Sequence, residues 1–221
     1  MWKGLTENRR VRDLKVEADR VQVLFVHGPG QVKVTVTYRL RTDGKLMVTT
    51  DFDPVKDDLP DPLRVGLRFD TDPALANLEW YGRGPQESYV DRQTGYAIGR
   101  YKGTVAEQFH DYARPQETGN KNDVRWIALS DPSGQGVKVT GAQPLSANAL
   151  AFPYEDLYAR PRGERRSADI TPHGEGTLLI DLAQIGVGGD TGWSLEARSL
   201  VKYRIPLKAQ SYSFTIETLA P

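Results

Sequence analysis

The sequence predicts an all-β protein built from antiparallel sheets stacked as a sandwich. Three observations support this prediction: short segments in which apolar and polar residues alternate, tight-turn signals between those segments, and very little helical pattern. Successive side chains of a strand point to opposite faces of the sheet, so alternation gives each strand one apolar and one polar face. Antiparallel sheets with one solvated face bury the other face against a second layer.

The clearest alternation lies in residues 32–39, which run Val-Lys-Val-Thr-Val-Thr-Tyr-Arg. The valines and the tyrosine share one face, and the polar residues share the other. Asp43-Gly44 follows and predicts a hairpin turn, because both positions tolerate positive φ. Residues 46–52 are then the returning strand. Similar patterns predict further strands over residues 65–69, 124–129, 137–140, 178–182 and 212–217.

The segments with helical pattern are short. Residues 104–110 and 154–159 suffice for one or two turns, which argues against the crossover helices of an α/β barrel or a doubly wound sheet. Residues 160–175 contain two prolines and a cluster of charges, so we expect an exposed loop there. Because there is no obvious linker or internal repeat, residues 1–221 are predicted to form a single domain.

Composition argues against several classes of partner and cofactor. The 29 Lys and Arg residues balance the 29 Asp and Glu residues, whereas a nucleic-acid binder normally carries a basic excess. No apolar run approaches the roughly 18 residues that span a bilayer, so no membrane partner is predicted. The sequence has no cysteine, and His27, His110 and His173 lie far apart. We therefore expect neither a metal site nor another cofactor.

Three segments, at residues 80–92, 112–126 and 186–193, combine aromatic, glycine, carboxylate and guanidinium groups. Carbohydrate-contact surfaces are built this way, because aromatic rings stack on a pyranose while polar groups bond its hydroxyls. In the first two segments we favour a structural role, in which arginines pair with carboxylates inside the loops. The residues concerned are Trp80, Arg83, Glu87, Asp91, Arg92, Arg114, Glu117, Asn120, Asp123 and Arg125.

The third segment favours ligand contact. Gly188 and Gly189 let the backbone turn through positive φ, which leaves Trp193 free to project from a loop. Trp126 lies within an expected strand and is predicted to be part of the core.

In sequence and order these segments resemble the C-terminal domain of five-domain β-galactosidases of glycoside hydrolase family 2, the small-chain type. The resemblance rests on Trp-Tyr-Gly-Arg-Gly-Pro-Gln-Glu-Ser-Tyr, on Arg-Pro-Gln-Glu-Thr-Gly-Asn and on Gly-Val-Gly-Gly-Asp-x-x-Trp, and it covers residues 59–194 best. It implies a large antiparallel super-sandwich similar in fold to galactose mutarotase.

The resemblance also implies an enzyme that hydrolyses terminal β-D-galactosides such as lactose and whose active site is built by more than one domain. The two catalytic glutamates of a retaining enzyme lie about 5 Å apart, and in this family they belong to a separate barrel, so no catalytic residue is expected here. Trp193 is similar to the residue that stacks on the aglycone sugar, and Asp190 helps to shape its loop. The implied partners are a β-galactoside and the other domains of the parent enzyme.

The sequence departs from the family pattern at three places. The loop reads Gly-Gly-Asp-Thr-Gly-Trp, whereas the family commonly has Gly-Gly-Asp-Asp-Ser-Trp. A histidine usual after Leu-x-x-Ala is absent from residues 157–162. The family's upstream Arg-Ala-Pro-Thr-Asp-Asn-Asp stretch is also missing, so we expect the chain to begin inside the domain.

Two other functions stay open. An aldose 1-epimerase would need a general base and a general acid, for which His110 or His173 with Glu117 or Glu175 are the only candidates. A free-standing galactoside-binding module would need measurable affinity in isolation. The sequence leaves the compartment open between bacterial cytoplasm and periplasm, and it leaves open whether the chain forms a homo-oligomer.

Overall fold

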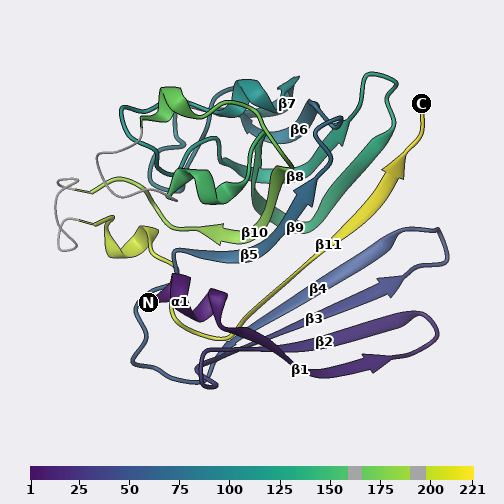
Figure 1. Cartoon of the computed structure of the whole chain (residues 1–221), viewed down its shortest axis with the longest axis vertical. Coiled ribbons are helices and arrows are strands. Elements are labelled where there is room, and N and C mark those ends of the chain that lie inside the picture. Colours follow the sequence, from purple (N-terminus) through teal and green to yellow (C-terminus); the bar gives the residue numbers. More distant parts are fainter. Residues whose placement is uncertain (159–165, 190–197) are drawn as a thin grey trace.

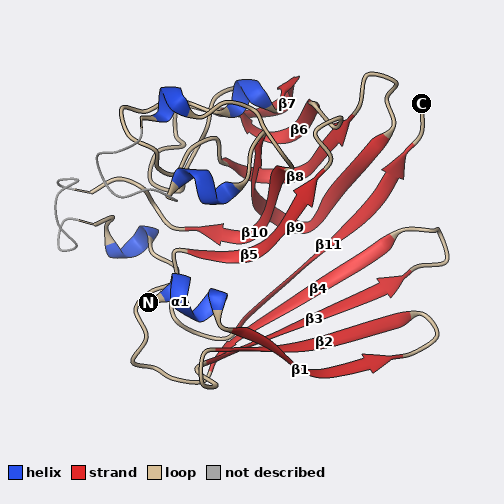
Figure 2. Ribbon diagram, viewed as in Figure 1, coloured by secondary structure: helices blue, strands red, loops and turns tan. Residues whose placement is uncertain are grey.

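The computed structural model describes residues 1–158, 166–189 and 198–221, and strands make up much of them (Figure 1, Figure 2). Helical structure in these ranges is limited to α1 (Trp2–Glu7) and the 3₁₀ turns η1 (Ala106–Gln108), η2 (Tyr154–Leu157), η3 (Ser167–Asp169) and η4 (Val201–Tyr203). The strands are β1 (Arg9–Val16), β2 (Arg20–His27), β3 (Val32–Leu40), β4 (Leu46–Pro54), β5 (Arg64–Thr71), β6 (Asn77–Gly84), β7 (Ala97–Thr104), β8 (Lys121–Ser130), β9 (Gly136–Leu150), β10 (Gly176–Gln184) and β11 (Gln210–Leu219).

All described strands belong to one antiparallel sheet, which forks along β9. From edge to edge the main path runs β1-β2-β3-β4-β11-β9-β8-β6-β7. The first part of β9, up to Gly141, pairs with β11, whereas Ser146 to Leu150 pair with β10. β10 in turn pairs with β5, so these two strands form a branch. The predicted all-β antiparallel fold class is confirmed.

The branch of β5 and β10 folds back over β4 and β11 and makes a second layer (Figure 1). The ring of Phe69 on β5 meets that of Phe214 on β11 edge-on, with 6.2 Å between centroids. The Tyr212 hydroxyl donates a hydrogen bond to the Ile180 carbonyl of β10, at 2.9 Å. The predicted sandwich is therefore confirmed, with one forked sheet supplying both layers. Buried core residues include Val36, Val48, Leu78, Trp80, Ile127, Leu145, Leu178 and Ile180.

The helix α1 closes one end of the space between the two layers. Leu5 packs in a cluster with Val32 of β3, Phe52 of β4 and Val65 of β5. The ring of Trp2 lies 6.3 Å from that of Phe52, centroid to centroid. No helix within the described ranges is long and apolar enough to cross a membrane.

Trp126 is not the core residue that the sequence predicts. It is half-buried on β8, and the cations of Arg100 and Lys138 lie 5.4 and 5.1 Å from its ring centroid. The pairing of β8 with β9 shifts register between Val124 and Trp126. Such a shift breaks the alternation of faces, so Ile127 points into the core in its place.

Candidate functional site

The loop after β6 and the segment before β8 meet at the carboxylate of Glu87, which is buried. Its Oε2 accepts a hydrogen bond from the backbone N–H of Gly119, at 2.6 Å. Its Oε1 accepts hydrogen bonds from the guanidinium of Arg92 and the hydroxyl of Tyr112. The structure thus brings together the two motif segments at residues 80–92 and 112–126.

The pKa of Glu87 lies below its ordinary value. Burial is the largest influence and acts to raise it, but the hydrogen bonds from Tyr112, from the Gly119 N–H and from Arg92 together outweigh burial. Glu87 is therefore a carboxylate at neutral pH, and its oxygens are occupied by donors of the protein itself.

Asn120 ties the same segment to the sheet and is completely buried. Its Nδ2 donates to the carbonyl of Ser88, at 2.9 Å, and the Ser88 N–H donates to the carbonyl of Asn120, at 2.7 Å. The hydroxyl of Ser146 on β9 donates to Asn120 Oδ1, at 2.8 Å. Every one of these contacts is internal, so Asn120 has a structural role.

Arg83, at the end of β6, holds the following loop. Its Nε donates to Asp123 Oδ2 at 2.6 Å, and its Nη1 donates to the carbonyls of Gln93 and Tyr96 at 3.2 and 2.9 Å. The Arg83 carbonyl accepts a hydrogen bond from Trp80 Nε1, at 2.9 Å. The predicted pairing of arginines with carboxylates is confirmed for Arg83.

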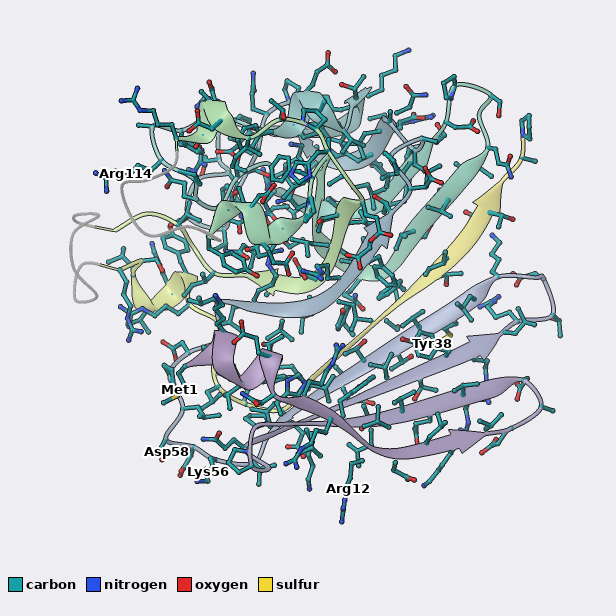
Figure 3. All side chains as sticks on the ribbon, in the orientation of Figure 1. Met1, Arg12, Tyr38, Lys56, Asp58 and Arg114 are labelled. Atoms are coloured by element: carbon teal, nitrogen blue, oxygen red, sulfur yellow. The ribbon has the colours of Figure 1, made fainter. Side chains whose placement is uncertain are left out.

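The other three arginines of the motifs differ from one another. Arg92 pairs with Glu87, as predicted. Arg125 donates instead to a backbone carbonyl, that of Asp123, and its guanidinium lies 5.7 Å from the ring centroid of Tyr81. Arg114 is exposed and extends outward (Figure 3), and no ion pair joins it to another described residue. The pairing prediction is therefore wrong for Arg125 and Arg114.

Glu117 pairs with Arg64, a residue that the sequence patterns do not connect to it. Arg64 Nη2 lies 2.9 Å from Glu117 Oε1, and Arg64 Nη1 contacts the fully buried Asp181. Glu117 also accepts hydrogen bonds from the hydroxyls of Tyr89 and Tyr154, at 3.3 and 3.0 Å. Burial raises the pKa of Asp181 to about 7, although Arg64 favours its ionised form.

Lys121 is a second charged residue that the sequence analysis missed. It is 2% exposed, its Nζ donates to the Gly119 carbonyl at 3.1 Å, and its Nζ lies 5.1 Å from the ring centroid of Trp80. Burial lowers the pKa of Lys121 to about 8. The negative charge of Glu87 acts in the opposite direction and raises this pKa, but its effect is smaller.

The glycine segment after β10 is fastened to the loop after β6. The backbone N–H of Gly188 donates to Asp91 Oδ2, at 2.6 Å. A Cβ on Gly186 would lie 2.6 Å from the same oxygen, so this close approach requires glycine. Gly189 is exposed. The two residues predicted to contact substrate, Asp190 and Trp193, lie outside the described residues.

Within the described residues, Glu117 does not pair with either of the histidines considered for an epimerase. Glu117 is engaged by Arg64 and two tyrosines, and neither His110 nor His173 forms a hydrogen bond with it in the described ranges. His173 instead pairs with Asp156. No group of three or more metal-ligating side chains was found in the described part of the chain. What this region can do is fix the geometry of its loops.

Comparison with known proteins points to one family. The model of the family described as beta galactosidase small chain matches residues 1–217. A β-galactosidase of Priestia megaterium is 34% identical over 185 residues, which are 83% of this chain and 17% of that protein. A β-galactosidase of Streptococcus thermophilus is 35% identical over 199 residues, which are 87% of this chain and 19% of that protein. The chain thus spans less than a fifth of the length of these relatives.

One similar solved structure is described as a galactose mutarotase related enzyme from Lactobacillus acidophilus. The match covers 96% of this chain and 71% of that one, with a TM-score of 0.44 and 9% identity. A likeness this distant supports no conclusion about function. The family match over residues 1–217 shows that the chain belongs to the β-galactosidase small chain family.

Proposed function

We propose that this chain is a non-catalytic domain of a retaining β-galactosidase of glycoside hydrolase family 2, which hydrolyses terminal β-D-galactosides such as lactose. The domain completes the aglycone side of an active site whose catalytic glutamates lie elsewhere in the parent enzyme. Its partners are the β-galactoside and the other domains of that enzyme. It supplies Trp193 and Asp190, and it needs no cofactor of its own.

The observation that carries this proposal is the hydrogen bond between the Gly188 N–H and the Asp91 carboxylate. This hydrogen bond anchors the start of the segment that leads to Trp193. A side chain that contacts substrate needs a backbone held in place, so that it meets the substrate in one geometry. The aromatic face of Trp193 is suited to stack on the apolar face of a pyranose.

The carboxylates of the motif region favour a supporting role over catalysis. A retaining glycosidase needs two carboxyl groups about 5 Å apart, free to flank the scissile bond. Glu87 is held by Arg92, Tyr112 and a backbone N–H, and Glu117 is held by Arg64 and two tyrosines. Groups engaged in this way hold loops together and are not free to act on a glycosidic bond.

Kinetics of the Trp193→Ala variant in the parent enzyme test this proposal. We expect kcat/KM for lactose to fall about 10-fold, equivalent to about 1.4 kcal/mol of lost stacking. Hydrolysis of β-galactosyl fluoride, which has no sugar aglycone, should stay unchanged. Trp126→Ala serves as the matched control and should leave both substrates unaffected. Unchanged lactose kinetics in Trp193→Ala would contradict the role of Trp193.

A further inference from the structure

The chain leaves β10 through residues 185–189 and comes back to β11 through residues 198–205, which we call the outgoing arm and the returning arm. The two arms touch at their bases. The Gly186 N–H of the outgoing arm donates a hydrogen bond to the Tyr203 carbonyl of the returning arm, at 2.9 Å. A Cβ on Gly186 would lie only 3.0 Å from the Cβ of Tyr203, so the two backbones approach closely.

The outgoing arm is held by two further backbone amides. The Ile185 N–H donates to the carbonyl of Leu63, just before β5, at 3.0 Å. The Gly188 N–H donates to Asp91 Oδ2, at 2.6 Å. The outgoing arm is thus fastened to the start of β5, to the loop after β6 and to the returning arm.

The returning arm is held by the side chain of Arg204. Its Nε donates to the carbonyl of Ser199, five residues earlier, at 2.7 Å. Ser199 is buried, whereas Leu200 and Val201 after it are exposed, so the arm is fixed at Ser199 and the turn η4 projects from it. Arg204 is itself fixed, because Ile205 next to it is buried in the cluster that includes α1 (Figure 1).

Asp61, on the connection between β4 and β5, faces both ends of the returning arm. Its Oδ2 lies 3.9 Å from Arg198 Nη2 and 4.0 Å from Arg204 Nη1. The Asp61 carbonyl accepts a hydrogen bond from Trp2 Nε1, at 3.2 Å. Ion pairs this long and partly exposed are weak. The hydrogen bond from Arg204 to the Ser199 carbonyl is therefore the stronger fastening of this arm.

We propose that Arg204 is a positioning residue for the aglycone side of the parent enzyme's active site, and that it acts by holding the returning arm against the outgoing arm. This inference rests on the proposed function, in which Trp193 contacts the aglycone sugar. A side chain on a segment held at both bases has fewer accessible positions than one on a segment held at a single base. Less ordering is then required when the sugar binds.

The chemistry of the contact favours arginine at this position. The guanidinium presents several N–H donors in one plane, so one side chain can bond the Ser199 carbonyl through Nε and face Asp61 through Nη1. Lysine has no donor at the Nε position. It keeps only a positive charge that faces Asp61, so Arg204→Lys should preserve part of the function and Arg204→Met none of it.

Steady-state kinetics of the parent enzyme test the proposal with two substrates. We expect Arg204→Met to lower kcat/KM for lactose about 5-fold, mainly through KM, and to leave hydrolysis of β-galactosyl fluoride unchanged. Unchanged hydrolysis of the fluoride also shows that the variant folds. The matched control is Arg41→Met, which removes an arginine paired with Asp43 in an exposed hairpin and should affect neither substrate. An equal loss on both substrates would overturn the proposal, because a purely structural role predicts that result.

A double-mutant cycle with Trp193→Ala shows whether Arg204 acts through Trp193. In the Trp193→Ala background, Arg204→Met should change kcat/KM for lactose less than about 2-fold, whereas independent effects would multiply and would contradict the proposal. If Trp193→Ala alone leaves lactose kinetics unchanged, the proposed function fails and this inference fails with it. If Trp193→Ala impairs lactose hydrolysis and Arg204→Met does not, only this inference fails.

Hydrogen–deuterium exchange of the intact enzyme supplies a readout that does not depend on activity. Loss of the Arg204 contact should loosen the returning arm and with it the Tyr203 carbonyl that accepts from Gly186. We expect peptides covering residues 185–189 to exchange at least about 5-fold faster in Arg204→Met than in the wild type, while peptides of β8 exchange equally. Unchanged exchange of residues 185–189 would overturn the proposal.

Discussion

The carboxylate of Asp91 accepts a hydrogen bond from the backbone N–H of Gly188, although the two residues are 97 positions apart in the chain. The distance of 2.6 Å between Asp91 Oδ2 and the Gly188 nitrogen is typical of a strong hydrogen bond to a charged group. It joins the loop after β6 to the segment after β10.

Replacing Asp91 with alanine should destabilise the chain. A hydrogen bond to a charged group contributes about 2 kcal/mol, and its loss frees the start of the glycine segment. Asp91→Asn keeps an acceptor oxygen and should cost less. Urea unfolding followed by circular dichroism measures both, with Asp43→Ala in an exposed hairpin as the control. Equal stability of Asp91→Ala and the wild type would show that the contact contributes nothing.

A methyl group on Gly186 should disturb the same contact. Its Cβ would lie 2.6 Å from Asp91 Oδ2 and 3.0 Å from the Cβ of Tyr203. Overpacking of this kind costs about 1–3 kcal/mol. Gly95→Ala is the control, because nothing lies within 4 Å of the position of its added methyl group. Thermal unfolding of the two variants checks this, and a Gly186→Ala variant as stable as Gly95→Ala would contradict it.

The low pKa of Glu87 predicts a loss of stability in acid. Its pKa in the folded chain lies below the unfolded value of about 4.5, so its contribution is complete above that pH and is lost as the pH falls through the folded pKa. Glu87→Gln removes this proton linkage. We therefore expect the free energy of unfolding to fall more steeply below pH 4.5 in the wild type than in Glu87→Gln.

The control for this experiment is Glu79→Gln, which removes an exposed carboxylate paired with Arg100. It should follow the wild type over the same pH range. If Glu87→Gln also followed the wild type, Glu87 would not be the carboxylate whose protonation destabilises the fold.

Lys121 predicts a pH dependence of the same sign as that of Glu87, but in the alkaline range. Its folded pKa of about 8 lies below the unfolded value of 10.5, so the unfolded chain binds more protons between these values and stability rises with pH there. The free energy of unfolding gained from this titration, between pH values well below 8 and well above 10.5, is about 3 kcal/mol. Lys121→Met lacks this titration, so the wild type should gain stability relative to Lys121→Met between pH 8 and 10. Urea unfolding at several pH values measures the difference, and a constant difference would contradict the prediction.

The fold could be predicted where alternation is strong. The segment at residues 32–39 forms β3, and the segment at residues 46–52 forms β4. β2 was missed because its apolar residues, in Arg-Val-Gln-Val-Leu-Phe-Val-His, occupy both faces. β6 and β7 were missed because glycines and charged residues interrupt the apolar–polar alternation of their sequences. Tertiary packing still holds both strands in the sheet.

The site could be predicted only in part. Pairing of the motif arginines with motif carboxylates was expected from the sequence, and it holds for Arg83 with Asp123 and for Arg92 with Glu87. Arg64 and Asp181 are 117 residues apart and meet because β5 pairs with β10. Alternation placed Arg64 on the polar face of a strand, and only the lone carboxylate in the apolar run at residues 178–182 hinted at a buried charge.

A proton NMR time course on freshly dissolved α-lactose, with this chain added, tests the central claim most directly. It follows anomer exchange and the release of galactose in one sample. A non-catalytic domain should leave both at the rate of the buffer control. Release of galactose would contradict the account by showing that the chain holds its own catalytic pair, and faster anomer exchange would make it an epimerase.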